Sequence, residues 1–310
     1  MMGRMDDRED RAARREGIIL LIVVVLVWGL TWPVNKVILT SLPPLWMAAM
    51  RAAIATVALF VIAISRGHLV TPCPADAPVL LSITMLHMVG FVILSYVGLQ
   101  LVPTGRSVVL AYTTPLWVTP GASLFLKERL TARRGLGVIM GVLGLIALFN
   151  PVEFDWSDRR AVLGNSAIVG AALLWAANIL HIRGHKWHSS PFELVPWETL
   201  LATLILTLIA LASSSVPHVE WNATLVLLLL YSGVPGTALA YWAIATASRN
   251  LPAVTTSLGL LGTPVVSVVI ATLWLGETLS LSLVVAIVLI LGGVTIGTME
   301  KKERSLPTPV

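Results

Sequence analysis

The sequence predicts an all-α integral membrane protein in which ten transmembrane helices form two inverted five-helix repeats. The first observation is composition, because 56% of the 310 residues are hydrophobic and only 12% are charged. Soluble domains are about 45–50% apolar and about 25% charged. The second observation is a series of ten long apolar runs, and the third is a similarity between the two halves of the chain. The composition argues against a soluble enzyme, a disulfide scaffold and a disordered chain.

The apolar runs are long enough to cross a bilayer, since a helical span needs roughly 20 residues. The first run continues past signal-peptide length without a clear small-residue cleavage site, so we interpret it as a retained span. The predicted spans cover residues 18–40, 44–65, 78–99, 103–126, 132–150, 161–183, 193–214, 222–246, 252–275 and 279–299.

The lysines and arginines predict the orientation of these spans. With a cytoplasmic N-terminus, sixteen of them fall on the cytoplasmic side and three on the outside, which is a strong positive-inside bias. This distribution explains the net charge of +5 without a nucleic-acid partner. We expect a cytoplasmic N-terminal tail (1–17), a first repeat (18–150), a periplasmic linker (151–160), a second repeat (161–299) and a cytoplasmic C-terminal tail (300–310).

The two halves of the chain share residues at nearly constant spacing. Trp28 and Pro44 match Trp175 and Pro191 at an offset of 147. Seven further residues have partners at an offset of 149: Pro103, Thr114, Pro115, Leu126, Glu128, Leu130 and Gly144 match Pro252, Thr263, Pro264, Leu275, Glu277, Leu279 and Gly293. Five spans per copy is an odd number, so the second copy starts on the opposite side of the membrane. Inverted repeats are typical of secondary transporters, whose substrate site lies near the midplane between the copies.

Several local motifs resemble a known family. Thr113–Leu116, Leu126–Thr131 and the glycine-rich stretch that follows resemble the EamA-type repeat of the drug/metabolite transporter superfamily, as do Gly262–Pro264 and Leu275–Ser280. Gly236–Tyr241 resembles the third helix of that repeat, and Arg51 fits the pattern of its second helix. The resemblance covers about residues 18–299 and implies a ten-helix exporter of amino acids or other metabolites, including aromatic amino acids.

The leading hypothesis is therefore a secondary transporter that moves a small organic solute, foremost an amino acid, out of a bacterial cell across the inner membrane. The alternative is an exporter of lipophilic cations, although no Asp or Glu is expected near a span centre. A membrane-embedded enzyme would need a cluster of catalytic groups at one depth, and the sequence does not predict one. A structural scaffold would not need the inverted repeat. No P-loop is present and no cofactor is expected. Ten spans could form a complete monomeric unit, with the lipid bilayer and the solute as partners.

Two prolines lie near the centres of repeat-related spans, Pro115 in 103–126 and Pro264 in 252–275. A proline removes a backbone hydrogen bond, and in lipid the freed carbonyl needs a partner or a cavity. One interpretation is a kink packed against a neighbouring helix. The other, which we weigh equally, is that both prolines bend their helices around a central cavity and contribute to gating.

Aromatic and polar residues deep in the spans are candidates for substrate binding. Trp28, Thr31, Trp32 and Asn35 share one helix face, as Trp175 and Asn178 do in the related span. Tyr112 lies near the centre of its span. The tryptophans suit either packing or the wall of a cavity for an aromatic or amphipathic ligand. Asn178 suits either substrate binding or a hydrogen bond between helices.

His87 is the ionisable residue expected closest to the midplane, with Phe91 one turn further along. Ionisable groups within membranes are usually functional, so His87 is a candidate for substrate contact or proton handling, although a buried neutral histidine is the alternative. Arg51 and Glu198 are repeat-equivalent, and the favoured interpretation is that each extends towards a membrane surface. The alternative is a gate or a charge contact with the substrate.

The remaining candidates favour structural roles. Glu128 and Glu277 recur at span ends, where Thr131 and Ser280 suit helix N-caps. His181, His185 and His188 have spacing that could hold a metal. They lie among basic residues at a predicted helix end, so no metal is expected.

Overall fold

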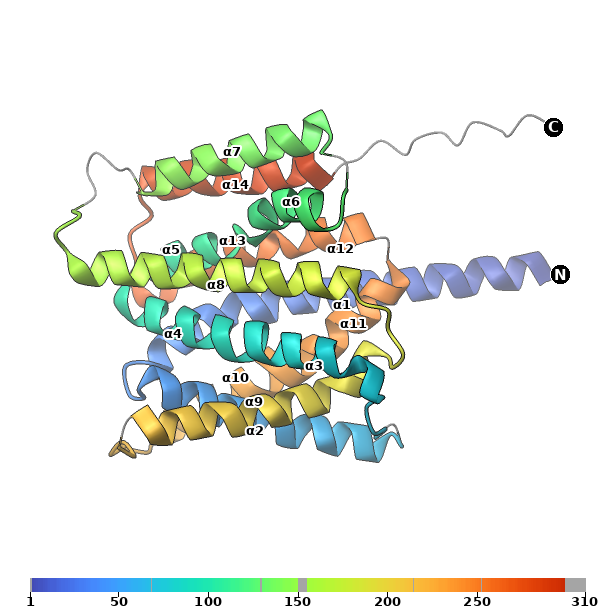
Figure 1. Ribbon diagram of the computed structural model, residues 1–310, viewed down its shortest axis with the longest axis horizontal. Coiled ribbons are helices and arrows are strands. Elements are labelled where there is room, and N and C mark those ends of the chain that lie inside the picture. The colour runs from blue at the N-terminus through green and yellow to red at the C-terminus, as the bar shows by residue number, and fades with distance from the viewer. Residues whose placement is uncertain are drawn as a thin grey trace.

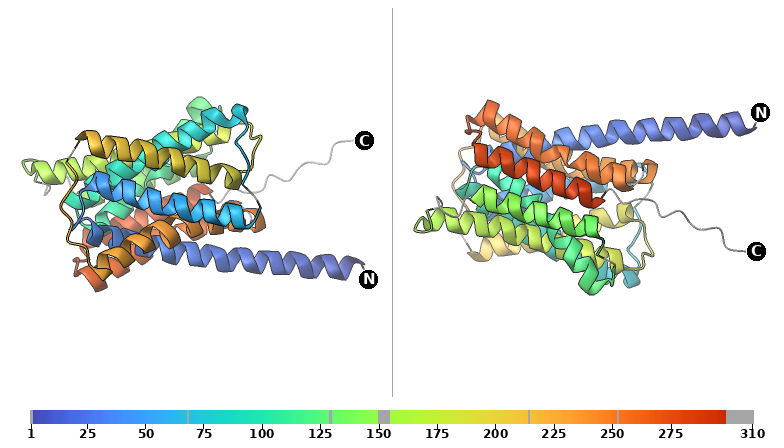
Figure 2. Two further views of the ribbon diagram at one scale, coloured as in Figure 1. Left: turned by 90° about the horizontal axis from the view of Figure 1, so that it is seen from below. Right: turned by 90° about the horizontal axis from the view of Figure 1, so that it is seen from above.

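The computed structural model describes residues 2–67, 69–128, 130–149, 155–213, 215–251 and 253–298. All regular structure in these ranges is helical, and ten stretches within them are long and apolar enough to cross a membrane. The predicted helical class and the ten spans are therefore confirmed, with most ends within a few residues of those expected. The spans run along one direction of the molecule, and the first part of α1 extends beyond the other helices (Figure 2).

Six spans are single helices and four are divided into segments. The single helices are α1 (Met2–Ile38), α2 (Pro44–Ser65), α7 (Ala132–Phe149), α8 (Arg159–Gly184), α9 (Pro191–Ser213) and α14 (Leu281–Thr298). The third span consists of η1 (Pro74–Asp76), α3 (Ala77–Ser82), η2 (Ile83–Phe91) and α4 (Val92–Leu101), and the fourth of α5 (Thr104–Ala111) and α6 (Thr114–Phe125). The eighth span consists of α10 (Ala223–Gly233), η3 (Val234–Leu239) and α11 (Ala240–Asn250), and the ninth of α12 (Ala253–Leu260) and α13 (Gly262–Leu275).

The helices pack in pairs that join the two halves of the chain. Helix α7 lies beside α14 on one face of the bundle, and α2 lies beside α9 on the opposite face (Figures 1 and 2). Between these pairs, α1 packs against α11 and α13, and α8 packs against α4 and α6. Each of these contacts has its counterpart when the two halves are exchanged. The segmented spans therefore surround α1 and α8 at the centre of the molecule.

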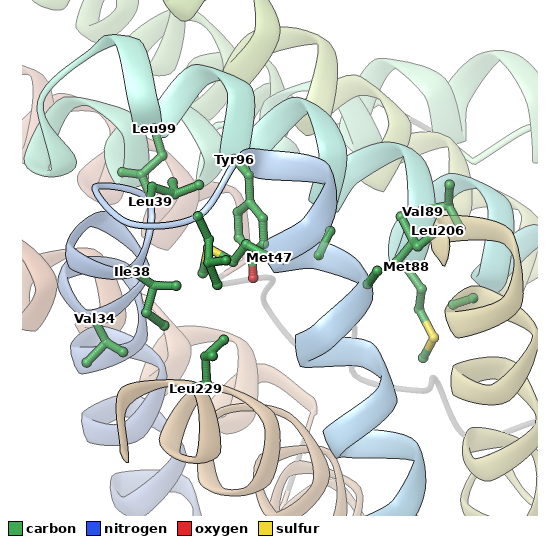
Figure 3. Close-up of a cluster of buried hydrophobic side chains, with 14 of the residues drawn as sticks. Val34, Ile38, Leu39, Met47, Met88, Val89, Tyr96, Leu99, Leu206 and Leu229 are labelled. Carbon is green, nitrogen blue, oxygen red and sulfur yellow. The ribbon is translucent and has the colours of Figure 1, made fainter. Parts of the chain in front are cut away.

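A core cluster ties helices of both halves together (Figure 3). Ile38 at the end of α1, Met47 of α2 and Leu99 of α4 are completely buried, and they share this cluster with Leu206 of α9 and Leu229 of α10. Burying such side chains contributes about 1.5–3 kcal/mol each in water. In a bilayer this burial contributes mainly close packing, because lipid tails are as apolar as leucine.

The outer faces of the bundle are apolar, as expected beside lipid. On α2, Val57, Val61 and Ile64 are 60–65% exposed and recur at helical spacing. Leu204, Leu208 and Leu211 of α9 repeat the pattern. Such continuous exposed stripes are rare on soluble monomers, so they agree with a bundle that is surrounded by acyl chains.

Glycines allow α7 and α14 to approach closely. A Cβ atom on Gly137 of α7 would press against the carbonyl of Gly293 on α14, and a Cβ atom on Gly293 would press against the carbonyl of Gly137. Small residues at such crossings let backbones touch. A Cβ atom on Gly135, two residues before Gly137, would meet no atom within 4 Å. This backbone contact explains Gly137, whereas Gly141 leaves room for the side chain of Leu116 on α6.

Candidate functional site

A cavity of about 100 Å³ lies at the centre of the bundle between the two halves of the chain. Helix α1 contributes Trp28, Thr31, Trp32 and Asn35, which recur at i, i+3, i+4 and i+7 and so share one face. The rest of the lining comes from α2, η2, α4, the end of α5, α8, η3 and α11. A site built from eight elements of both halves can change shape when the halves move.

Aromatic rings form one wall of this cavity. The His87 ring stacks on Trp175 at 5.5 Å with an interplanar angle of 16°, and Phe91 lies 5.3 Å from both rings. Tyr112 meets Trp175 edge to face at 6.0 Å, and Tyr241 meets the His87 ring edge to face at 6.3 Å. These separations are the preferred ones for aromatic pairs. The wall therefore offers faces and edges to a flat or apolar ligand.

Arg51 of α2 brings a positive charge to the same cavity. Its Nη1 donates to the hydroxyl of Tyr96 at 2.8 Å, and its Nε donates to the carbonyl of Ser232 at 3.3 Å. The guanidinium also lies 5.9 Å from the Tyr96 ring centroid. Tyr96 is 3% exposed, so a rigid neighbour holds the cation in place.

The carbonyl that accepts from Arg51 belongs to a polar network. Ser232 donates through Oγ to Asn35 Oδ1 at 2.7 Å, and Thr237 donates through Oγ1 to the Ser232 carbonyl at 2.8 Å. Ser232 lies two residues before the π-helical segment η3, and His87 and Phe91 lie in the π-helical segment η2. Such segments are frequent at functional sites. Here they place the polar network and the aromatic wall around one cavity.

The fourth and ninth spans are interrupted beside the same region. Helix α5 ends at Ala111 and α6 begins at Thr114, while α12 ends at Leu260 and α13 begins at Gly262. Pro115 and Pro264 therefore lie in the first turn of the second segment, where a missing N–H costs nothing. Thr114 Oγ1 donates to the carbonyls of Ala111 at 2.8 Å and Ala172 at 3.3 Å. The Thr114 side chain thus supplies a hydrogen bond to a backbone carbonyl at the break between α5 and α6.

Residues 15–150 and 162–299 each match the EamA-like transporter family. The chain belongs to this family. An uncharacterized transporter of Bacillus subtilis, YoaV, is 26% identical over 92% of this chain and 98% of its own length. A Salmonella typhimurium protein named a probable amino-acid metabolite efflux pump is 30% identical over 94% of this chain and 97% of its own.

Two further comparisons concern part of the chain and the fold. A riboflavin transporter of Vibrio cholerae is 34% identical over 50% of this chain and 52% of its own length. A crystal structure superposes with a TM-score of 0.67 over 91% of this chain and 98% of the other, at 20% identity, which shows a shared fold. This EamA-like protein is therefore a multi-pass membrane transporter that acts on small molecules, and it is not an enzyme.

Five of the six residues expected to bind substrate in this EamA-like transporter line the central cavity: Trp28, His87, Phe91, Tyr112 and Trp175. The sixth, Asn178, is 2% exposed and is not part of the lining. Its Oδ1 accepts from Ser82 Oγ at 3.3 Å, which places it in a contact between α8 and the third span. The expected gating prolines lie elsewhere, because Pro264 is buried in α13 and Pro115 lines a separate cavity of about 510 Å³.

The favoured interpretation of Arg51 and Glu198 was wrong. Arg51 lines the central cavity instead of extending to a membrane surface, and Glu198 of α9 is 2% exposed. Arg51 turns inward because Tyr96 and Ser232 offer it hydrogen-bond acceptors inside the bundle. The available signal was the position of Arg51, seven residues after the first residue of its apolar helix.

The histidines near the end of α8 form a different group from the one their spacing suggested. Helix α8 ends at Gly184, so His181 lies in the helix and His185 and His188 lie in the loop after it, with the His181 and His185 ring centroids 6.4 Å apart. Both loop histidines contact Asp76 Oδ1, at 3.0 and 3.3 Å, and these three residues offer ligand atoms within 4.8 Å of one another. The backbone N–H groups of His188 and Ser189 also donate to Asp76. This buried carboxylate fixes the loop, and its geometry could also hold a divalent ion.

The repeat-equivalent glutamates lie outside the cavity, as their expected structural role requires. Glu277 accepts from the backbone N–H groups of Thr104 and Gly105 at 2.6 and 2.9 Å, so it caps α5. Glu128 instead pairs with the guanidinium groups of Arg134 and Arg183. The predicted N-caps are confirmed, because Thr131 Oγ1 accepts from Arg134 N at 3.3 Å and Ser280 Oγ accepts from Leu283 N at 3.2 Å.

Proposed function

We propose that this chain is a secondary transporter that exports small organic metabolites, foremost amino acids including aromatic ones, by alternating access around the central cavity. The observation that carries the proposal is the aromatic-walled cavity enclosed jointly by both family repeats. In this conformation its volume of about 100 Å³ is below the roughly 300–1,000 Å³ of typical ligand pockets. A solute of that class therefore requires the walls to separate, which is the movement that alternating access supplies.

The proposed mechanism treats the two halves as inverted repeats. In support, α1 and α8 run in opposite directions along the bundle (Figure 1), and the helix pairs correspond when the halves are exchanged. Rocking of one inverted repeat against the other would expose a central site to each side in turn. The excess of Lys and Arg at one end of the spans supports cytoplasmic termini, and the bacterial relatives support a location in the inner membrane.

Two kinds of evidence support the proposed solute class, the lining of the cavity and the names of the relatives. The Salmonella relative is named for amino-acid metabolites, and an aromatic wall beside a cation suits an amino acid with an apolar side chain. Riboflavin also has a flat ring system, and the partial match to a riboflavin transporter makes it a comparison solute. Export of lipophilic cations remains the second candidate, because aromatic faces attract cations.

Counterflow in proteoliposomes tests the proposal. Vesicles that contain the purified protein are preloaded with unlabelled solute and diluted into labelled tryptophan, phenylalanine, threonine, riboflavin or a lipophilic cation, with and without a pH gradient. We expect exchange of the aromatic amino acids above the level of protein-free vesicles, and a pH-gradient effect would identify proton coupling. Exchange of the lipophilic cation without exchange of any amino acid would overturn the proposal in favour of the second candidate.

A further inference from the structure

The central cavity contains the cation of Arg51, and no carboxylate lines the cavity beside it. Glu198 is buried in α9, which packs against α2, but it forms no ion pair with Arg51 among the described residues. Within the part of the chain that the structure describes, each recorded ion pair involves residues other than Arg51. The neighbours that do bond Arg51 are a hydroxyl and a carbonyl, and no Asp or Glu is among the residues that line the cavity. Charged residues within membrane bundles are costly unless they are paired or face a polar space. Arg51 therefore has the environment of a group that meets its counter-ion in the cavity.

The two bonds made by Arg51 leave part of its guanidinium available. A guanidinium carries five N–H donors, of which one on Nη1 and the one on Nε bond Tyr96 and Ser232. The three remaining N–H groups are one on Nη1 and two on Nη2, and donors on these two nitrogens can match the two oxygens of a carboxylate. Arg51 also lines a second cavity of about 40 Å³ on the side of α9. The cation thus borders open space on more than one side.

The guanidinium is held in a fixed position. Tyr96 comes from α4, and the Ser232 carbonyl is itself bonded by Thr237. The Ser232 side chain is held in turn by Asn35 of α1. Four spans therefore determine where the guanidinium lies. A preorganised donor loses less entropy on binding than a mobile one, and this is what a recognition group requires.

The opposite wall of the cavity suits an apolar group. His87 and Trp175 present stacked rings, with the tilted ring of Phe91 beside them, in the cavity that also contains Arg51. A ligand that satisfies both walls has a carboxylate at one end and a flat or apolar group at the other. Aromatic amino acids have this form, whereas aromatic amines and lipophilic cations lack the carboxylate.

We propose that Arg51 binds the carboxylate of the transported solute, so that the transporter selects carboxylate-bearing solutes with an apolar or aromatic side chain over amines and cations of the same shape. This inference rests on the proposed function, since it assigns the solute class of the same cavity. Tyr96 is a positioning residue, because it holds the guanidinium and does not supply charge.

The first experiment compares solutes that differ only in the carboxylate. Unlabelled phenylalanine, phenylalaninamide and phenethylamine compete with labelled phenylalanine in counterflow. We expect phenylalanine to compete at least tenfold better than either analogue, because charge-assisted hydrogen bonds are about twice as strong as neutral ones. Equal competition by phenethylamine would overturn the inference and leave the proposed transport function standing.

The second experiment changes the arginine. Arg51→Gln is expected to raise the apparent KM for phenylalanine at least tenfold and to abolish the preference over phenylalaninamide. Arg51→Lys, which keeps the charge and loses the paired donors, and Tyr96→Phe, which frees the guanidinium, should give intermediate values. Arg66→Gln is the matched control, because Arg66 directly follows the same helix and lies over the Trp242 ring outside the cavity. Monodisperse size-exclusion profiles establish that each variant is folded.

A binding measurement tests the carboxylate subsite at Arg51 independently of the proposed transport function. The purified protein is titrated with phenylpropionate and with phenylpropanamide while its tryptophan fluorescence is followed, which requires no transport. Binding of the acid that is lost in Arg51→Gln and kept in Arg66→Gln supports the carboxylate subsite even if counterflow fails. Failure of the acid to bind more tightly than the amide would overturn it.

Discussion

The repeat-equivalent glutamates Glu277 and Glu128 allow a stability prediction with an internal control. Glu277 accepts two backbone hydrogen bonds, from Thr104 N at 2.6 Å and Gly105 N at 2.9 Å, at the positive end of the helix dipole of α5. A hydrogen bond to a charged group contributes about 1.5–3 kcal/mol. Glu277→Gln keeps one oxygen acceptor and turns an amide N–H₂ towards the other donor. We therefore expect a loss of about 2 kcal/mol in the free energy of unfolding.

Glu128→Gln is the matched control, because the substitution is the same and only the partners differ. The Glu128 side chain is 27% exposed and Arg183 is 43% exposed, and exposed ion pairs contribute about 0–1 kcal/mol. Unfolding in detergent micelles by titration with sodium dodecyl sulfate, followed by circular dichroism, measures both variants against the wild type. Equal destabilisation by the two substitutions would refute the reasoning, since the backbone cap would then contribute no more than a surface pair.

Three further predictions concern transport and packing. Pro115→Ala and Pro264→Ala are expected to reduce counterflow severalfold with little change in expression, and wild-type transport by both would show that the helix breaks do not depend on these prolines. Gly137→Leu is expected to abolish the monodisperse folded protein because α14 leaves no room for a Cβ atom, whereas Gly135→Leu on the same helix should be tolerated, as size-exclusion chromatography can test. Trp175→Ala is expected to raise the apparent KM for aromatic solutes at least tenfold with threonine less affected; equal losses for both solutes in a counterflow assay would contradict the aromatic wall.

The spans could be predicted from the sequence because bilayer thickness fixes the length of an apolar helix. The shared face of Trp28, Thr31, Trp32 and Asn35 followed from the regular spacing of a helix, and the structure places all four along the cavity. The contact between His87 and Phe91 followed in the same way and is found at 5.3 Å between ring centroids. These inferences needed only local geometry, which a single sequence contains.

The positions of several side chains depend on residues far away in the chain, so the sequence alone could not predict them. Arg51 could extend outward or inward, and the inward choice depends on Tyr96 and Ser232, 45 and 181 residues further along the chain. The location of Asn178 depends on Ser82, which is 96 residues away. The prolines indicated a disturbance of the helix, but a proline within a bent helix and a proline in the first turn of a new one give the same sequence signal.

If Arg51 binds the solute carboxylate as proposed, the fixed cation also favours one of the two solute classes considered for this cavity. Two like charges 4 Å apart repel each other by about 4 kcal/mol at an effective dielectric constant of 20. A lipophilic cation would meet this cost beside Arg51, and no carboxylate among the lining residues offsets it. An amino acid brings its own carboxylate to the guanidinium and can direct its ammonium group away from it. The aromatic wall alone would accept both solutes, so in our proposal the selection between them follows from the position of one arginine side chain.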